Sequence, residues 1–181
     1  MKKEILIAGF GGQGVMAIGK NMVEAGMSEG REVTWVPTYG PEMRGGTSNC
    51  SVILSDEPIG APIVSAPTDL IAMNQQSLEK YAPTVRSGGL IFVNGSDAQG
   101  LEREDVTVYP IPCIQIAAEL GNPRAANMVM LGAYAAATGT LRQETLEGMV
   151  RHMFSGPKAH LAQLNIQALQ AGMDCVSKAA C

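Results

Sequence analysis

The chain opens with Glu4-Ile5-Leu6-Ile7-Ala8, which runs directly into Gly9-Phe10-Gly11-Gly12-Gln13-Gly14. The short apolar run after Glu4 is typical of a buried strand. Apolar residues then recur at the spacing of one helix face, at Val15, Ile18 and Met22. This stretch therefore predicts a strand, a glycine-rich turn and a helix, which is the opening unit of many α/β folds.

Strands and helices are predicted to alternate beyond this unit. We expect strands at 32–36, 48–54, 69–73, 89–93 and 106–111, and helices at 75–85 and 115–120. The alternation predicts an α/β, Rossmann-like fold with a mostly parallel sheet flanked by helices. No linker or repeat interrupts the pattern, so a single domain covering residues 1–181 is expected.

The last third of the chain is predicted to be helical. An Ala- and Gly-rich helix is expected at 127–138, either as a plain core helix or in close contact with another element. Thr140 followed by Gln143 is a capping-box pattern, which predicts the start of the next helix. Pro157 is placed at the N1 position of the final helix and Gly172 at its C′ position.

Composition and charge exclude several classes of function. The chain has 21 glycines, a net charge of −4 and 13 basic residues that form no cluster beyond Lys2-Lys3. Nucleic-acid binding and membrane-surface binding therefore lack the positive charge they require. The uncharged tract at 125–141 is shorter than the ~20 apolar residues of a membrane span, and no signal peptide is recognised. A cytoplasmic protein is expected.

The cysteines and histidines do not have the spacing of metal ligands. Cys50, Cys113, Cys175 and Cys181 include no C-x-x-C pair, so this chain alone is expected to hold neither a zinc ion nor an iron–sulfur cluster. We expect reduced thiols. His152 and His160 lie on predicted helices and are interpreted as surface residues.

The glycine loop at 9–14 fits the pattern G-x-G-x-x-G between a strand and a helix. Such a loop brings backbone N–H groups and a helix N-terminus close to an anion. Classical NAD binding also needs an acidic residue at the end of the second strand, where this chain has Thr34-Trp35-Val36-Pro37. Two interpretations stay open: the loop binds a phosphate or polar group, or it is a tight turn without a ligand.

A second loop, between Pro37 and Cys50, carries the more specific pattern. Its prolines restrict the chain and its glycines let it turn, and it displays the side chains of Tyr39, Glu42, Arg44, Thr47 and Asn49. Loops at the carboxyl ends of strands are where α/β proteins place their sites. The guanidinium of Arg44 is suited to a carboxylate or a phosphate, or to an internal ion pair with Glu42.

These two loops resemble the gamma subunit of 2-oxoacid:ferredoxin oxidoreductases. The matching strings are Gly11-Gly12-Gln13-Gly14-Val15 and Pro37-Thr38-Tyr39-Gly40-Pro41-Glu42-Met43-Arg44-Gly45-Gly46-Thr47-Ser48-Asn49-Cys50-Ser51-Val52-Ile53. The likeness is closest to the 2-oxoglutarate (KorC-like) branch. It continues through residues 127–133 and the pattern N-x-x-A-x-x-x-G from Asn165 to Gly172, and so covers essentially the whole chain.

The resemblance implies one part of a larger enzyme. Such complexes decarboxylate a 2-oxoacid on thiamine diphosphate, pass electrons through [4Fe-4S] clusters to ferredoxin and transfer the acyl group to coenzyme A. Thiamine diphosphate, magnesium and the clusters are implied for alpha-type, beta-type and ferredoxin-like partner subunits. The gamma part is implied to be an α/β domain that packs against them, is associated with coenzyme A and is inactive alone.

The resemblance also suggests where coenzyme A would bind. The two loops are expected to meet at the carboxyl edge of the sheet, and the expected binding residues are Gly9, Gly11, Gly12, Gln13, Gly14, Tyr39, Glu42, Arg44, Thr47 and Asn49. The backbone of 11–14 would contact phosphate or hydroxyl groups of coenzyme A, or the backbone of a neighbouring subunit. Arg44 would be a charge contact, while the other side chains of the second loop would shape that loop or an interface. No catalytic residue and no metal ligand is expected in this chain.

Other functions stay open at this point. The sequence leans toward 2-oxoglutarate, and a gamma-type subunit for pyruvate, a branched-chain 2-oxoacid or indolepyruvate is an alternative, because partner subunits would largely select the substrate. A free-standing nucleotide-binding module is a third interpretation. A homodimer of the isolated chain, formed through a surface that other subunits normally cover, is a further expectation.

Overall fold

The computed structural model describes residues 1–38 and 47–179. The chain forms two compact units, Met1–Pro110 and Ile111–Cys181, and each is described by itself. The first unit contains the sheet and the second contains helices.

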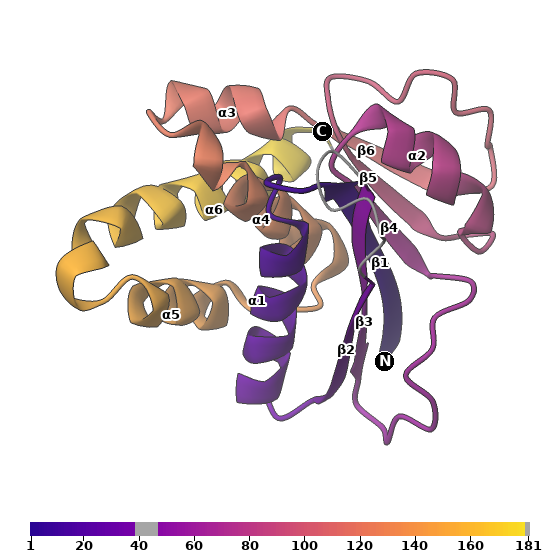
Figure 1. The fold of residues 1–181 in the computed structure, drawn as a ribbon, viewed down its shortest axis with the longest axis horizontal. Coiled ribbons are helices and arrows are strands. Elements are labelled where there is room, and N and C mark those ends of the chain that lie inside the picture. Colours follow the sequence, from indigo (N-terminus) through magenta and orange to yellow (C-terminus); the bar gives the residue numbers. More distant parts are fainter. Residues whose placement is uncertain (39–46, 180–181) are drawn as a thin grey trace. The chain divides into compact units, whose positions relative to one another are not determined.

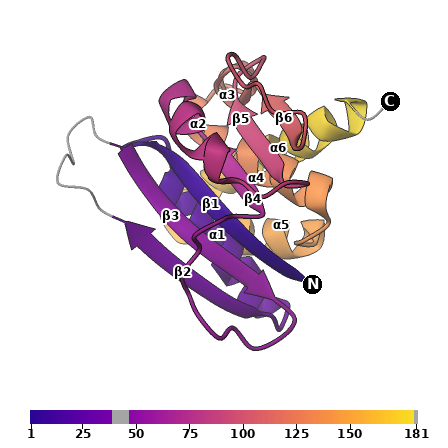
Figure 2. The ribbon, with the colours of Figure 1, turned by 90° about the vertical axis from the view of Figure 1, so that its right-hand side faces the viewer.

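The first unit is a six-stranded sheet with helices on both faces (Figures 1 and 2). Its elements are β1 (Lys2–Phe10), α1 (Val15–Ser28), β2 (Glu32–Thr38), β3 (Thr47–Ser55), β4 (Asp69–Ala72), α2 (Gln75–Tyr81), a short 3-10 helix η1 (Ala82–Thr84), β5 (Leu90–Asn94) and β6 (Thr107–Ile111). The strand order is β2-β3-β1-β4-β5-β6. The expected α/β class, with helices flanking the sheet, is confirmed.

The sheet is mixed, where a mostly parallel sheet was expected. β1, β4 and β5 run parallel, but β3 is antiparallel to both of its neighbours, β1 and β2. Residues 39–46 alone separate β2 from β3. A parallel connection needs a crossover of about a dozen residues or more, so this short connection returns the chain in the opposite direction.

Helix α1 lies on one face of the sheet at very short distance, because glycines face the strands. A Cβ atom at Gly19 would lie 2.7 Å from Sγ of Cys50, and one at Gly26 would lie 2.8 Å from Cδ2 of Leu54. Burial raises the pKa of the Cys50 thiol to about 11, and the thiol donates a hydrogen bond to the carbonyl oxygen of Val15 at 3.7 Å. Cys50 is therefore a neutral packing residue of this interface.

Helix α2 covers the opposite face. In the β1–β3 pairing Ile7 stands beside Cys50 and Leu6 beside Ser51, so Leu6 faces away from α1. Leu6 belongs to a buried cluster whose members include Leu78 of α2 and Leu70, Ala72, Ile91 and Val93 of the neighbouring parallel strands. Both faces of the parallel strands are therefore apolar, as their continuous hydrophobic sequence predicts.

The second unit is built from α3 (Cys113–Glu119), η2 (Pro123–Ala125), α4 (Ala126–Thr138), α5 (Gln143–Met153), η3 (Gly156–Lys158) and α6 (Ala159–Ala179). Its centre is the crossing of α4 and α6. A Cβ atom at Gly132 would lie 2.0 Å from the carbonyl oxygen of Leu169, and one at Gly172 would lie 1.9 Å from that of Val129. The Ala- and Gly-rich helix is thus both a core helix and a closely packed one, which unites the two interpretations of its sequence.

Two predictions about helix ends are wrong. Gly172 lies inside α6 and not at its C′ position, because the same missing side chain that suits a helix end is used here for backbone contact with α4. The capping box is absent: the N-cap of α5 is Arg142, and Oγ1 of Thr140 is buried without a hydrogen-bond partner among the described residues. Pro157 does lie in the short 3-10 helix that leads into α6.

The helix crossing predicts that Gly172→Ala lowers the free energy of unfolding by about 3 kcal/mol or more. An added methyl group would overlap a backbone carbonyl, which has no rotamer to adopt, and overpacking alone typically costs about 1–3 kcal/mol. The matched control is Gly148→Ala in the exposed face of α5, where a Cβ atom meets nothing within 4 Å. This control should be neutral or raise the free energy of unfolding by up to ~1 kcal/mol. Equal stability of the two variants in urea denaturation would contradict the close crossing.

Candidate functional site

The candidate site lies at the carboxyl edge of the parallel strands. The connection after β1 leads through α1 to β2 on one side of β1, whereas the connection after β4 leads through α2 to β5 on the other side. At the ends of β1 and β4, therefore, successive connections leave toward opposite sides of the sheet. Open α/β sheets place their ligand crevice at such a switch point.

The glycines of the first loop divide into two roles. A Cβ atom at Gly9 would lie 2.8 Å from Cγ2 of Val15, so this position is closed by packing. Gly12 and Gly14 have φ angles of 92° and 79°, which favour glycine. At Gly11 and Gly12, by contrast, no heavy atom among the described residues lies within 4 Å of a would-be Cβ atom. As far as residues 1–38 and 47–179 show, the loop thus leaves open space directly outside the start of α1.

The side chain of Gln13 holds this loop in place. Its Oε1 atom accepts hydrogen bonds from the backbone N–H of Phe10 at 2.7 Å and from Nδ2 of Asn74 at 2.8 Å. Its Nε2 atom donates to the carbonyl oxygen of Met73 at 3.0 Å, and Nδ2 of Asn94 donates to the same carbonyl at 3.2 Å. These bonds tie the end of β1 to the ends of β4 and β5. Gln13 was expected to contact a ligand through its backbone, and its side-chain amide is used within the protein.

The start of α1 is suited to an anion. The N-cap residue is Gly14, which has no side chain to accept hydrogen bonds from the first turn. The helix is 14 residues long, so its aligned peptide dipoles place partial positive charge at this end. Backbone N–H groups, open space and favourable dipole coincide here, which is the arrangement that binds phosphate groups in many proteins.

The described end of the second loop lies beside the glycine loop. In the β1–β3 pairing Phe10 stands opposite Thr47 and Ala8 opposite Asn49. Nδ2 of Asn49 donates a hydrogen bond to the hydroxyl of Tyr81 at 3.1 Å. The sequence expectation that the two loops converge is thus met where β3 begins. Tyr39, Glu42, Arg44 and the side chain of Thr47 lie outside the described residues.

Sequence reasoning missed four residues of this edge: Met73, Asn74, Tyr81 and Asn94. Asn74 carries a recognisable signal, because an asparagine between a strand and a helix is a typical N-cap, and its side chain does accept a hydrogen bond from the N–H of Ser77. The bonds of Tyr81 and Asn94 carry no such signal, since their partners are far away in the sequence.

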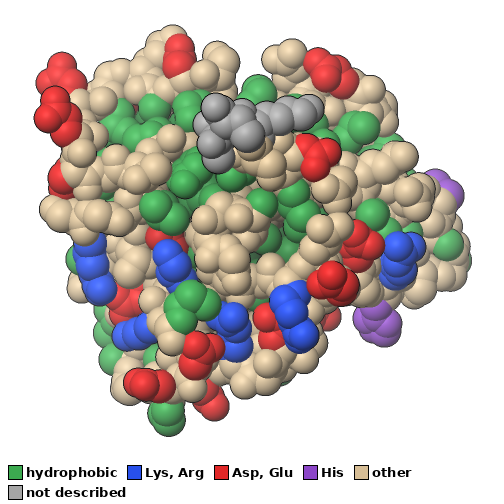
Figure 3. Space-filling view, turned by 180° about the vertical axis from the view of Figure 1, so that it is seen from behind, with side chains coloured by type: hydrophobic (Ala, Val, Ile, Leu, Met, Phe, Trp, Pro, Cys, Tyr) green, Lys and Arg blue, Asp and Glu red, His purple; other side chains and the backbone are tan. Residues whose placement is uncertain are grey.

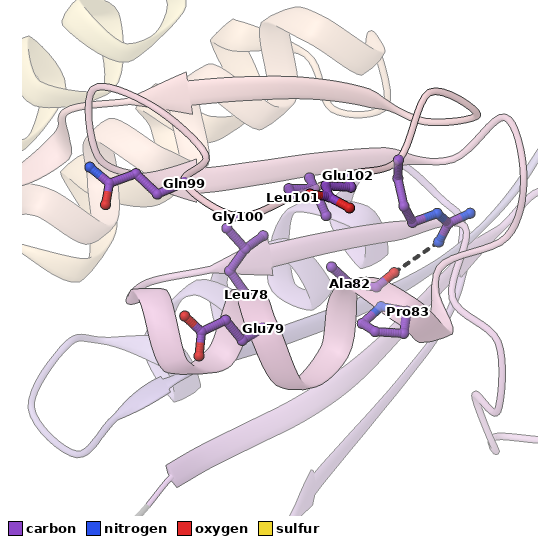
Figure 4. Close-up of a pocket in the computed structure, with 9 residues that line it drawn as sticks. Leu78, Glu79, Ala82, Pro83, Gln99, Gly100, Leu101 and Glu102 are labelled. Carbon is purple, nitrogen blue, oxygen red and sulfur yellow. Dashed lines mark hydrogen bonds between the residues drawn. The ribbon is translucent and has the colours of Figure 1, made fainter.

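An apolar pocket of the first unit lies elsewhere, between α2 and residues 99–103 (Figure 4). It has a volume of about 300 Å³, with Leu78, Ala82, Pro83 and Leu101 among its walls. The guanidinium of Arg103 at its edge donates to the carbonyl oxygens of Ala82 and Val85 and pairs with Asp105. Its charge is therefore used to hold the chain together.

Metal ligands do not gather in residues 1–38 or 47–179: these ranges contain no group of three or more His, Cys, Asp or Glu side chains able to hold an ion. Cys50 and Cys113 are buried thiols outside any disulfide, and burial raises the pKa of each. His152 and His160 are exposed, as the sequence predicts.

The surface carries charged side chains of both signs (Figure 3). Figure 3 shows acidic and basic side chains interleaved in the lower part of the view, whereas acidic side chains stand among hydrophobic ones in its upper part. Within the described part of the chain, every helix is too short or too polar to cross a membrane.

Comparison with known proteins shows the family of this chain. A family model described as pyruvate ferredoxin/flavodoxin oxidoreductase matches residues 4–175. The chain belongs to this family. The resemblance to its gamma subunits that the two loops indicate is confirmed.

Curated relatives include two kinds of subunit. The ketoisovalerate oxidoreductase subunit VorA of Methanothermobacter marburgensis is 42% identical over 96% of this chain, but over only 36% of its own length. The 2-oxoglutarate synthase subunit KorC of Methanocaldococcus jannaschii is 36% identical over 96% of this chain and 94% of its own. The chain therefore spans about a third of the VorA relative and nearly all of KorC.

Solved structures support the same relationship. The gamma subunit of a keto/oxoacid ferredoxin oxidoreductase from Geobacter sulfurreducens matches 97% of this chain and 99% of its own, with 31% identity and a TM-score of 0.83. A 2-oxoglutarate:ferredoxin oxidoreductase from Magnetococcus marinus, solved with 2-oxoglutarate, coenzyme A and succinyl-CoA bound, matches 98% of this chain and 31% of its own, with 26% identity and a TM-score of 0.89.

The Gln13 network predicts that Gln13→Glu lowers the free energy of unfolding by about 1–3 kcal/mol at neutral pH. The carboxylate would still accept from Phe10 and Asn74, but it would face the carbonyl oxygen of Met73 with no hydrogen to donate. That repulsion raises the pKa of the new carboxyl in the folded protein above its unfolded value of about 4.3.

The loss of unfolding free energy in Gln13→Glu should accordingly become smaller as the pH falls toward 4, because the protonated carboxyl again donates to Met73. Urea denaturation at a series of pH values measures this effect. Gln167→Glu, at an exposed position on α6, is the control and should show no comparable pH dependence. A pH-independent deficit at Gln13 would contradict the assigned hydrogen bond.

Proposed function

We propose that this chain is the gamma-type component of a 2-oxoacid:ferredoxin oxidoreductase complex. The complex would carry out coenzyme A-dependent oxidative decarboxylation of a 2-oxoacid to an acyl-CoA and pass the electrons to ferredoxin. Family membership and the end-to-end match to KorC and to a solved gamma subunit support this proposal. Alpha-type, beta-type and ferredoxin-like subunits would be its partners, and the chain alone would be inactive.

The role proposed for this chain is to hold the phosphate groups of coenzyme A. The observation that carries it is the open space at Gly11 and Gly12 outside the uncapped start of α1, at the switch point of the sheet. Coenzyme A would supply a thiol that accepts the acyl group. Backbone N–H groups of the glycine loop would bind its phosphates, and Arg44 of the second loop would add a positive charge.

Other side chains of the second loop, namely Tyr39, Glu42, Thr47 and Asn49, would shape this site or an interface with a partner. Gln13 and Gly9 would serve it indirectly, because one holds the loop by hydrogen bonds and the other lets it pack. Thiamine diphosphate, magnesium and the iron–sulfur clusters would be held by partner subunits.

For the substrate we propose 2-oxoglutarate. The KorC relatives match nearly their whole length, which supports this choice, but the VorA relative has the higher identity and favours a branched-chain 2-oxoacid as the second candidate. Reduction of ferredoxin by the purified complex, measured with 2-oxoglutarate, pyruvate, ketoisovalerate and indolepyruvate, decides between them. We expect the highest kcat/KM with 2-oxoglutarate, and a preference for ketoisovalerate would reverse the assignment.

The phosphate role predicts that Gly11→Asp raises the KM for coenzyme A about tenfold in the assembled complex. Gly11 has a negative φ, and no other described residue lies within 4 Å of a Cβ atom built there, so the variant should fold. An acidic residue near a helix N-terminus is also favourable for the helix itself. The carboxylate would, however, repel the phosphates, and tenfold corresponds to about 1.4 kcal/mol.

Gly11→Asn is the matched control, because it has the same size without the charge. It should raise the KM for coenzyme A much less, and neither variant should change the KM for the 2-oxoacid. Equal effects of Asp and Asn would show that the loop is merely crowded. An unchanged KM in both variants would remove the glycine loop from coenzyme A binding, while activity of the complex would still support the subunit assignment.

A further inference from the structure

Helix α2 contacts both loops of the candidate site, although it belongs to neither motif. At its start Asn74 accepts a hydrogen bond from the N–H of Ser77 at 2.8 Å and donates from Nδ2 to Oε1 of Gln13 at 2.8 Å. Asn74 therefore both caps α2 and holds the residue that orders the glycine loop. The first loop is tied to the amino end of α2.

The carboxyl end of α2 holds the second loop. Tyr81 is the last residue of α2, and its hydroxyl accepts a hydrogen bond from Nδ2 of Asn49 at 3.1 Å. Asn49, at the end of the second loop, is the third residue of β3 and pairs with Ala8 of β1. The face alternation of β3 puts Asn49 on the side of the sheet that α2 covers, opposite to Cys50.

The helix between these two contacts is held firmly against the sheet. Leu78 has 1% of its surface exposed and packs in the cluster with Leu6, Leu70 and Ala72. Ser77 of α2 and Ala82, the residue directly after α2, are also buried. Because α2 is anchored in its middle, its two polar ends act as fixed points for the two loops.

We propose that Tyr81 is a positioning residue for coenzyme A binding. Its hydroxyl fixes Asn49, and with it the start of β3, relative to the glycine loop that Asn74 and Gln13 hold at the other end of the same helix. This inference rests on the proposed function, since it assigns Tyr81 to the site through which the complex takes up coenzyme A. Tyr81 does not itself touch the reacting atoms.

The test is Tyr81→Phe in the assembled complex. Loss of one hydroxyl hydrogen bond should raise the KM for coenzyme A about three- to tenfold, with kcat and the KM for the 2-oxoacid nearly unchanged. Asn49→Ala should have a similar effect. The double variant should be no worse than the stronger single variant, because both changes remove the same hydrogen bond.

Tyr109→Phe is the matched control. Tyr109 stacks on Phe92, and its hydroxyl makes no hydrogen bond to any other described residue, so this variant should keep the wild-type KM for coenzyme A. An unchanged KM in Tyr81→Phe, additive effects in the double variant, or equal changes in both KM values would overturn the inference.

The Gly11→Asp and Gly11→Asn pair separates the two levels of failure. If Gly11→Asp weakens coenzyme A binding and Tyr81→Phe does not, the site stands and Tyr81 has no part in it. If neither variant changes the KM for coenzyme A, both the phosphate role of the glycine loop and the positioning role of Tyr81 fail.

Discussion

The candidate site depends on the hydrogen bonds that the side-chain amide of Gln13 makes. A turn between a strand and a helix carries several backbone groups that lack a partner within either element, and this turn has glycines where other proteins have capping side chains. Gln13 supplies an acceptor, which bonds the N–H of Phe10, and a donor, which bonds the carbonyl oxygen of Met73. The loop can therefore leave the N–H groups of α1 open without losing its own shape.

Glycines at the helix interfaces, which lack a side chain, determine the close packing within both units. Gly19 and Gly26 bring α1 onto the sheet, and Gly132 and Gly172 bring α4 and α6 together. The chain has 8 aromatic residues among 181, so aromatic side chains fill little of its interior. The glycines compensate for the scarce aromatic side chains, because they let a helix backbone approach its neighbours closely. Such close packing leaves few voids, and many dispersion contacts then add up. The high glycine content is thus an attribute of the packing as much as of the loops.

Local patterns predicted the elements well, and long-range partners explain what they missed. The first strand, the glycine turn and α1 follow from spacing alone, whereas the convergence of the two loops was expected from the family resemblance. The roles of Gln13 and Tyr81 follow from neither, because Met73 lies 60 residues from Gln13 and Tyr81 lies 32 residues from Asn49. Gly172 misled in another way: a glycine that could end a helix and a glycine that admits a neighbouring backbone look identical in sequence. Arg44, the most suggestive charge, lies outside the described residues.

The contact between Gly19 and Cys50 has a consequence for how such sequences can vary. The sulfur atom occupies the space that a side chain on α1 would need, so the two positions share one small volume. Alanine at position 19 would be accommodated only together with a smaller residue at position 50, and a bulkier residue at position 50 would leave no alternative to glycine at 19. The two positions should therefore change in concert, as a single unit of volume divided between a helix and a strand.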